Sequence, residues 1–325
     1  MIQEGISSTS YFLFLGGCSV SAVYWLARSG VAIAGKTPRP VRYSLASTLS
    51  SASYLVWRSK RLVTQQNMSH VLGLPVSDRR VKHAAFESWS LYGRTASDLI
   101  FFPHINMDDV DVHTVDMSQG ATWSEYVQQV MDSGKGAVVT TAHFGSWDMA
   151  GAIAARHFPL FAIAETFKDP RLNDLLQGAR IAKKVGIIPM ENSGRRVVEE
   201  LGNNHLVAIA VDRPSTKEKG VEVTFFGHKT YVPGGPAALA LKAGSAVLPG
   251  YVWYGPDHHY CIRAFPPIFS QPVDNPEERA QEIQRLTQYM YSCQEEVIRE
   301  WPTQWFMFRP FWPKQAGVAE SGPRE

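Results

Sequence analysis

The sequence predicts an α/β fold in which a mainly parallel central sheet is covered by helices. After Gly120, short runs rich in β-branched and aromatic residues alternate with stretches of helical periodicity. Several of these runs are apolar on both faces, which is typical of buried parallel strands. The chain has 325 residues, of which 45% are hydrophobic and 19% are charged, so it is long enough to form a full hydrophobic core.

The order of the expected elements defines three parts of the chain. We expect strands at 136–142, 158–164, 186–190, 205–212, 221–226, 246–254 and 260–265. Helices fit at 147–156, 169–184, 194–202, 236–243 and 276–300, and residues 62–102 have the apolar spacing of a helical cap. The predicted parts are an N-terminal helical segment at 1–61, an α/β domain with its cap at 62–313, and a flexible tail at 314–325.

The N-terminal segment has the character of a membrane tether. Residues 11–27 carry no charge and, as a helix, would measure about 26 Å against a bilayer core of about 30 Å. Only Glu4 precedes this run, which argues against a cleaved signal peptide. Residues 28–61 contain basic but no acidic side chains, which favours an anionic membrane surface on the cytoplasmic side. The alternatives are a buried core helix and a solvated basic face.

The composition and the motifs argue against several other classes of protein. A net charge of +2 is too small for nucleic-acid binding, and three widely spaced cysteines indicate neither a disulfide framework nor a zinc site. Residues 30–37 match the phosphate-loop pattern GxxxxGK[ST]. However, no strand precedes them, and Pro38 and Pro40 prevent the helix that such a loop requires. We therefore expect neither a zinc site nor a nucleotide-binding loop.

The candidate catalytic pair is His143 and Asp148, which follow an expected strand. If Ser146 caps the next helix, Asp148 lies in its first turn and the loop can bring His143 back against the carboxylate. Asp148 would then orient the imidazole, and Nε2 would accept a proton from a hydroxyl. The spacing alone is weak evidence, because His104 and Asp109 share it. The alternative is a structural histidine that caps the helix or lies in the core.

Three ordered segments add a family resemblance: HFGSWDMAG at 143–151, GVEVTFFG at 220–227 and VPGGPAALALKAGSAVLP at 232–249. The chain resembles the bacterial lipid A biosynthesis lauroyl/myristoyl acyltransferases and the related phosphatidylinositol mannoside acyltransferases, from about Gln66 to Trp305. These belong to the lysophospholipid acyltransferase superfamily. The resemblance implies transfer of an acyl group from a thioester to a hydroxyl, with His143 and Asp148 as the catalytic dyad and without metal or cofactor.

The same resemblance, with local chemistry, suggests further contacts. Arg180 matches an active-site arginine that can bind a phosphate or a developing oxyanion, although it also fits a helix surface. Asp212 and Arg213 match a position facing the acceptor, or alternatively form a turn. A helix start at Gly234 and Gly235 can approach a phosphate or thioester oxygen closely, or can be a plain helix start. Gly145 completes the substrate contacts that we expect.

The type of acidic residue at position 148 indicates which acceptor lipid to expect. Lipid A enzymes usually have Glu there, whereas Asp148 is closer to the mannoside-type enzymes. We expect acyl-ACP or acyl-CoA as donor, a membrane glycolipid or phospholipid as acceptor, and a location at the cytoplasmic face of a bacterial inner membrane. The alternatives are a lysophospholipid acyltransferase, an acyl-thioester hydrolase, and a membrane-bound lipid-binding protein without enzymatic activity.

Overall fold

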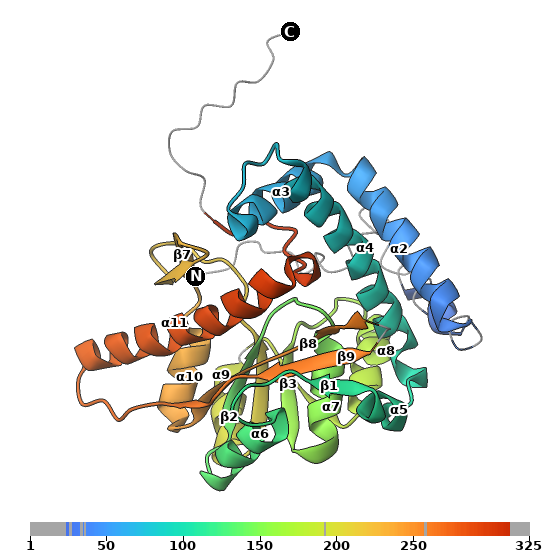
Figure 1. Ribbon diagram of the computed structural model, residues 1–325. Helices are drawn as coiled ribbons and strands as arrows, with labels where there is room; N and C mark the ends of the chain where they lie inside the picture. The colour runs from blue at the N-terminus through green and yellow to red at the C-terminus, as the bar shows by residue number, and fades with distance from the viewer. Residues whose placement is uncertain are drawn as a thin grey trace.

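The computed structural model describes residues 24–25, 28–32, 35, 37–191, 193–256 and 259–312. Its centre is an eight-stranded sheet of order β1-β9-β8-β2-β5-β3-β4, with β10 paired to β8 (Figure 1). The strands are β1 (Thr114–Asp116), β2 (Ala137–Thr141), β3 (Leu160–Ala164), β4 (Val185–Pro189), β5 (Leu206–Ala210), β8 (Ala246–Tyr254), β9 (Tyr260–Ala264) and β10 (Ile268–Phe269). The expected strand at 221–226 lies outside this sheet, because β6 (Val221–Phe225) forms a hairpin with β7 (His228–Val232).

The sheet is mainly parallel, as predicted. Among the described strands of this sheet, only the β8–β9 and β8–β10 pairings are antiparallel. Along β2, Ala137 packs into a cluster on one face of the sheet and Val138 into a cluster on the other face. Both faces are therefore buried, which explains why the strands are apolar without alternation.

Helices cover the two faces in separate groups. One face packs against α6 (Trp123–Asp132), α7 (Trp147–His157) and α8 (Pro170–Ile181). The other face packs against α9 (Ser193–Gly202), α10 (Gly235–Ala243) and the long α11 (Pro276–Glu300), which lies at the upper left of the sheet in Figure 1. Local sequence fixes where these helices begin: Thr122 and Glu125 form a capping box before α6, and Asn275 caps α11.

Three helices lie over one end of the sheet: α2 (Arg39–Val56), α3 (Arg58–Leu72) and α4 (Arg79–Phe101). The cap predicted at 62–102 corresponds to most of α3 and to α4. Figure 1 shows α2 and α4 side by side. Gly93 permits this contact, because a Cβ atom there would lie 2.4 Å from the carbonyl oxygen of Ala46. The predicted boundary between residues 61 and 62 falls inside α3, so α2 and α3 pack as parts of the cap.

A buried carboxylate joins this cap to the sheet. Asp98 of α4 accepts hydrogen bonds from the hydroxyls of Tyr43 in α2 at 2.8 Å, Tyr254 in β8 at 2.9 Å and Tyr260 in β9 at 2.8 Å. Burial raises the pKa of Asp98, and the tyrosine hydrogen bonds oppose that rise. Since one side chain bonds to three elements, Asp98 fixes α2 and α4 relative to the strands that border the site.

Among the residues that the structure describes, no helix is long and apolar enough to cross a membrane. The apolar run at 11–27 lies almost entirely outside the described residues, which include only 24–25 of it. The tail at 314–325 also lies outside them. The predicted membrane tether and tail therefore stay predictions.

A histidine pair connects α3 to the hairpin and to the C-terminal segment. The His70 ring stacks on Trp312 with centroids 4.4 Å apart, and it meets the His228 ring edge to face at 4.4 Å. Burial lowers the pKa of His70 to about 4, and the charge of His228 contributes to the decrease. The folded protein therefore favours a neutral His70.

This pKa predicts a pH-dependent stability. An unfolded histidine has a pKa of about 6.5, so His70 contributes stability above that value, and the contribution is lost as pH falls from 6.5 toward 4. We expect the wild-type protein to lose more unfolding free energy than His70→Gln over this range, as measured by urea denaturation. Equal slopes in the two proteins would contradict the prediction.

Candidate active site

His143 and Asp212 lie beside each other because their strands are neighbours. β2 and β5 are parallel, and Thr141 pairs with Ala210, so the residues two positions later leave the same edge of the sheet together. In open α/β sheets, ligands bind at the carboxyl edge of the strands. The strand register thus places two chemically active side chains where a substrate binds.

Asp212 is fully buried and holds His143 by two hydrogen bonds. Its Oδ1 lies 2.7 Å from the ring Nδ1, and its Oδ2 accepts the backbone N–H of His143 at 2.9 Å and the indole N–H of Trp305 at 3.1 Å. Burial alone would raise the pKa of Asp212, but the charge of His143 and these hydrogen bonds outweigh it and lower the pKa below its ordinary value. An ionised Asp212 requires the hydrogen on Nδ1, which leaves Nε2 as the basic nitrogen.

The orienting carboxylate therefore differs from the predicted one. Asp148 lies in the first turn of α7, as expected, but its Oδ1 accepts a hydrogen bond from Arg180 Nε at 2.7 Å. The imidazole Nδ1 is bound to Asp212 from the adjacent strand end. The role that spacing suggested for Asp148, holding the ring through Nδ1, thus belongs to Asp212.

Arg180 is held in place on the wall of the site. It extends from α8, with Nε bound to Asp148 and Nη1 donating to Gln177 at 2.8 Å. The Arg180–Asp148 pair is mostly buried, with side-chain exposures of 17% and 10%. The second carboxylate oxygen of Asp148 is buried and has no hydrogen-bond partner among the described residues. A fixed guanidinium and an unsatisfied carboxylate oxygen are thus available to a substrate.

A large apolar pocket adjoins these groups. Its volume is about 1300 Å³, above the roughly 300–1,000 Å³ of usual small-molecule sites. His143, Asp148, Arg180 and Arg213 line it at one side. Most of the remaining wall is aliphatic and comes from the cap helices and the sheet, including Leu45, Leu49, Ala96, Ile100, Ala154, Ala162, Leu175 and Ala208. Such a pocket fits a long hydrocarbon chain.

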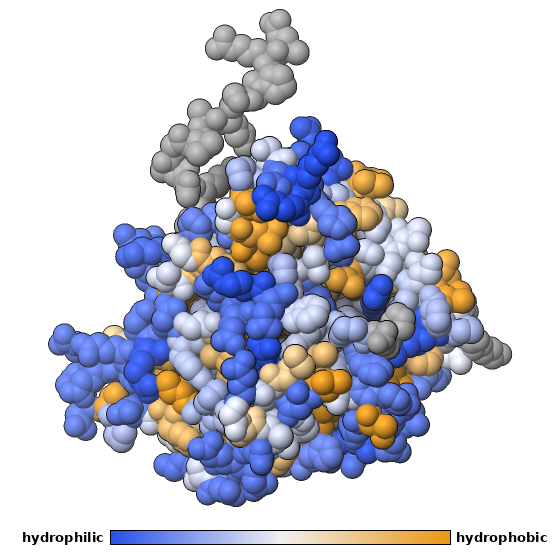
Figure 2. Space-filling view, in the orientation of Figure 1, coloured by the Kyte–Doolittle hydropathy of each residue, from blue (hydrophilic) through white to orange (hydrophobic). Residues whose placement is uncertain are grey.

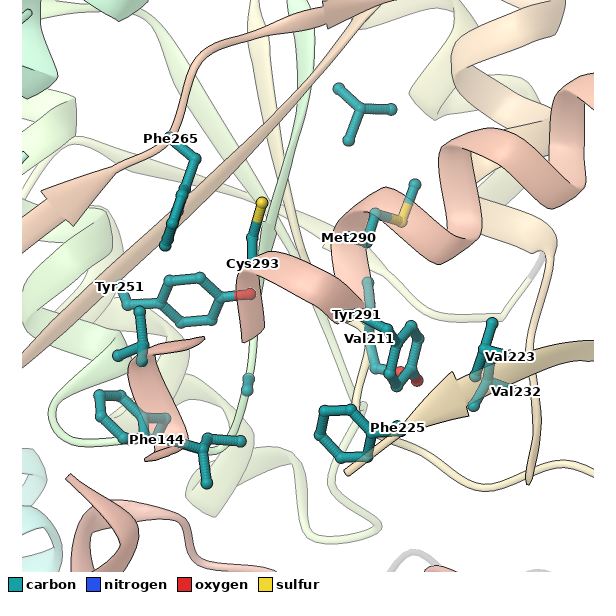
Figure 3. Packing of buried hydrophobic residues seen from close by; sticks show 14 of the residues in the cluster. Phe144, Val211, Val223, Phe225, Val232, Tyr251, Phe265, Met290, Tyr291 and Cys293 are labelled. Carbon is teal, nitrogen blue, oxygen red and sulfur yellow. The ribbon is translucent and has the colours of Figure 1, made fainter. Parts of the chain in front are cut away.

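The loop that carries His143 is fixed by a distant segment of the chain. Phe144 forms a β-bridge with Trp305, the N–H of Gly145 donates to the carbonyl of Gln304 at 2.9 Å, and Phe306 N–H donates to the carbonyl of His143 at 2.8 Å. Figure 3 shows Phe144 in the core beside Tyr251, and the ring centroids are 6.1 Å apart. The sequence interpretation assigned no role to Trp305, whose indole also binds Asp212.

Gly145 has a structural reason to be glycine. Its φ is +55°, and a Cβ atom there would lie 2.3 Å from the carbonyl oxygen of Val252. The carbonyl of Gly145 accepts the hydroxyl of Thr95 at 2.9 Å, and its N–H is bound to Gln304. Gly145 therefore has a packing role that shapes the loop, and its predicted contact with substrate stays a prediction.

Gly234 and Gly235 do not join the site. Neither lines the pocket that contains His143 and Arg180. A Cβ atom on Gly234 would lie 2.6 Å from Val221 and 3.2 Å from Ile283, so this glycine lets the start of α10 pack against the hairpin and α11. This packing fits the alternative of a plain helix start, and the predicted substrate contact of Gly234 and Gly235 stays a prediction.

The structure also gives the surroundings of Arg213, His104 and Asp109. Arg213 lines the pocket, and its guanidinium lies 4.0 Å from Glu165 and 3.5 Å from the sulfur of Met190. His104 packs its ring against Phe101, whereas Asp109 pairs with His113. His104 and Asp109 thus share the spacing of the candidate pair without forming a site.

The chain matches a known protein family along most of its length. Residues 18–314 match the family described as bacterial lipid A biosynthesis acyltransferase. The chain belongs to this family. The acyltransferase is similar to the phosphatidylinositol mannoside acyltransferase of Mycolicibacterium smegmatis, with 28% identity over 76% of this chain and 78% of that protein. It is also similar to the enzyme of that name from Mycobacterium tuberculosis H37Rv, with 29% identity over 76% of each chain.

A solved structure with some likeness to the acyltransferase is the 1-acyl-sn-glycerophosphate acyltransferase PlsC of Thermotoga maritima. The TM-score is 0.36 and the sequence identity is 13%. The likeness covers 81% of this chain and 98% of the PlsC chain.

The close packing of Gly145 predicts a destabilised Gly145→Ala variant of the acyltransferase. A left-handed φ costs about 1–2 kcal/mol for alanine, and the overlap with Val252 adds roughly 1–3 kcal/mol. Gly227→Ala is the matched control, since Gly227 has φ +75° and open space around it. Thermal denaturation should give a clearly larger loss for Gly145→Ala, and similar losses in the two variants would exclude the packing argument.

Proposed function

We propose that this acyltransferase transfers a fatty acyl group from an acyl thioester to a hydroxyl of a membrane glycolipid. The observation that carries the proposal is His143, held by a buried carboxylate, in the wall of a large apolar pocket. The pocket takes the acyl chain and brings its carbonyl to the imidazole. The donor is acyl-ACP or acyl-CoA, and the named activity of the mannoside acyltransferases supports a glycolipid acceptor.

The chemical step uses His143 as base and then as acid. Nε2 accepts the proton of the acceptor hydroxyl while that oxygen attacks the thioester carbonyl. Asp212 stabilises the imidazolium through Nδ1–H, and its burial keeps this interaction strong. When the tetrahedral intermediate collapses, the C–S bond breaks, and the imidazolium returns the proton to the leaving thiolate. The products are an ester and a free thiol.

Arg180 and Asp148 act on the substrate in this proposal. The guanidinium of Arg180, fixed by Asp148 and Gln177, stabilises negative charge that develops on the carbonyl oxygen. The unsatisfied oxygen of Asp148 accepts a hydrogen bond from the acceptor lipid. Asp148 thus serves the reaction by holding Arg180 and the acceptor, while Asp212 holds the imidazole.

Two other reactions use the same groups. A lysophospholipid can supply the hydroxyl, or water can replace it and give thioester hydrolysis. The mass of the product distinguishes the three reactions. Either a glycolipid gains an acyl group, or a lysophospholipid gains an acyl group, or free fatty acid is released.

Substitutions of His143, Asp212 and Asp148 test the mechanism. His143→Ala removes the base, and Asp212→Asn removes the charge that stabilises the imidazolium, so each should lower thiol release by roughly 10³–10⁴-fold. The measurement is thiol release from acyl-CoA in the presence of glycolipid. Asp148→Asn should raise KM for the acceptor as well as lower kcat, because Asp148 binds substrate in our assignment.

The controls separate chemistry from folding. Thermal denaturation should show that His143→Ala is folded, and undiminished activity in this variant would remove the mechanism. If Asp212→Asn kept full activity while Asp148→Asn lost it, the roles of the two carboxylates would be the reverse of those proposed.

The surface of α2 supports association with a membrane. Val41, Leu45, Leu49 and Val56 point outward at helical spacing, and Leu45 and Leu49 are 61% and 66% exposed. In Figure 2, hydrophobic surface is visible where α2 lies in Figure 1. Leu45, Leu49 and Val56 also line the pocket, so a lipid chain can pass from a bilayer into the site. Two basic side chains at the start of α3, Arg58 and Arg61, favour anionic headgroups. We place this surface at the cytoplasmic face of the bacterial inner membrane.

Vesicle binding tests this assignment. Leu45→Glu and Leu49→Glu should each weaken binding to vesicles with anionic lipid by about tenfold or more, because each removes the transfer free energy of one leucine and adds a negative charge. Co-sedimentation of the full chain gives the affinity. Val112→Glu is the control, since Val112 is 80% exposed on α5 (Met107–Val112) and does not line the pocket. Equal losses in all three variants would contradict an α2 surface.

A further inference from the structure

His143 lies in the wall of a second cavity whose chemistry differs from that of the acyl pocket. This cavity of about 40 Å³ is lined by the start of α3, the residues after β5 and the segment 306–309. At roughly 10–15 Å³ for one water, it holds a group of only a few atoms. Its lining contains three cations, Lys60, Arg213 and Arg309, and a single carboxylate, Asp212, which is bound to His143.

The ammonium group of Lys60 is placed at some energetic cost. Burial lowers the pKa of Lys60, and the nearby charge of Arg309 lowers it further. Within the described part of the chain, this ammonium makes no hydrogen bond or ion pair, and it lies 5.9 Å from the centre of the Trp57 ring. Two cations that repel each other in a partly buried place are stabilised when an anion binds between them.

The position of Arg309 is built into the fold. The side-chain nitrogen of Asn67 donates to the backbone carbonyls of Met307 and Arg309, each at 2.8 Å, and its oxygen accepts the N–H of Phe311 at 3.3 Å. Asn67 lies on α3, the helix whose first turn carries Lys60. One helix therefore fixes both cations at the same cavity.

Arg213 and Trp147 join this cavity to the acyl pocket. Both residues, together with His143 and Tyr92, line the two cavities. The imidazole is thus flanked by an apolar space on one side and a small cationic space on the other. A substrate that places its reacting atom at His143 can put a hydrocarbon chain in the first space and an anionic group in the second.

We infer that Lys60 and Arg309, with Arg213 at the border, bind a phosphate group of a substrate beside His143. Lysine and arginine side chains together form strong, charge-assisted hydrogen bonds with phosphate oxygens. The phosphate belongs either to the donor, as in the pantetheine arm of a thioester, or to a phosphate-bearing acceptor lipid. This inference rests on the proposed function, to which it adds a recognition site.

Kinetics with phosphate-bearing and phosphate-free substrates test the inference and identify the source. Lys60→Gln and Arg309→Gln should raise KM for the phosphate-bearing substrate by about 10- to 100-fold. If the donor supplies the phosphate, KM rises for acyl-CoA and stays unchanged for the acyl-N-acetylcysteamine thioester. If the acceptor supplies it, KM rises for a phospholipid acceptor with either donor. Lys82→Gln, which removes the same charge from an exposed position of α4, should match the wild type.

The results that test the phosphate site differ from the results that test the proposed acyl transfer. The inference is overturned if Lys60→Gln and Arg309→Gln leave KM for every phosphate-bearing substrate equal to that of Lys82→Gln. Should the wild-type protein release no thiol from any donor, the proposed function fails, and calorimetry with inorganic pyrophosphate decides the site alone. Binding to the wild type that is lost in Lys60→Gln supports the site, whereas absent or unchanged binding rejects it.

Discussion

The site depends on the fully buried carboxylate of Asp212. Its two oxygens bind the ring of His143, the backbone of His143 and the indole of Trp305, and thereby join two strand ends and the C-terminal segment. A buried charge is tolerated only where such partners surround it. The imidazole is consequently held in one tautomer and one orientation, and the apolar pocket and the cationic cavity are arranged around it.

Much of the fold could be predicted because the determinants are local. The apolar runs predicted six of the eight strands of the sheet but neither β1 nor β10. The boundaries of α11 at Pro276 and Glu300 match the expected helix. The hairpin at 221–232 was expected only as one strand of the sheet, because nothing in a β-rich run shows which strand it pairs with. Pairing depends on contacts between distant segments, which a single sequence does not display.

The same limit explains the outcome at the site. His143, Asp148, Arg180, Asp212 and Arg213 were all found from strand ends and family motifs, and all of them line one of the two cavities. Spacing favoured the nearer acid, Asp148, as the partner of the imidazole, whereas the parallel pairing of β2 and β5 brings Asp212 to the ring. The catalytic role of Asp148 stays a prediction. Trp305 was missed because its role arises from a contact between the two ends of the domain.

The bridge between Phe144 and Trp305 also has a consequence for biosynthesis. A ribosome delivers the chain from its N-terminus, so β2 and its histidine emerge long before residues 304–306 are available to hold them. Until then the loop lacks its partners, and the buried acid lacks the indole that helps to satisfy it. The nascent protein can thus collapse around its sheet while remaining inert. The hydrogen-bond partners of the site are complete only after synthesis of the domain is finished.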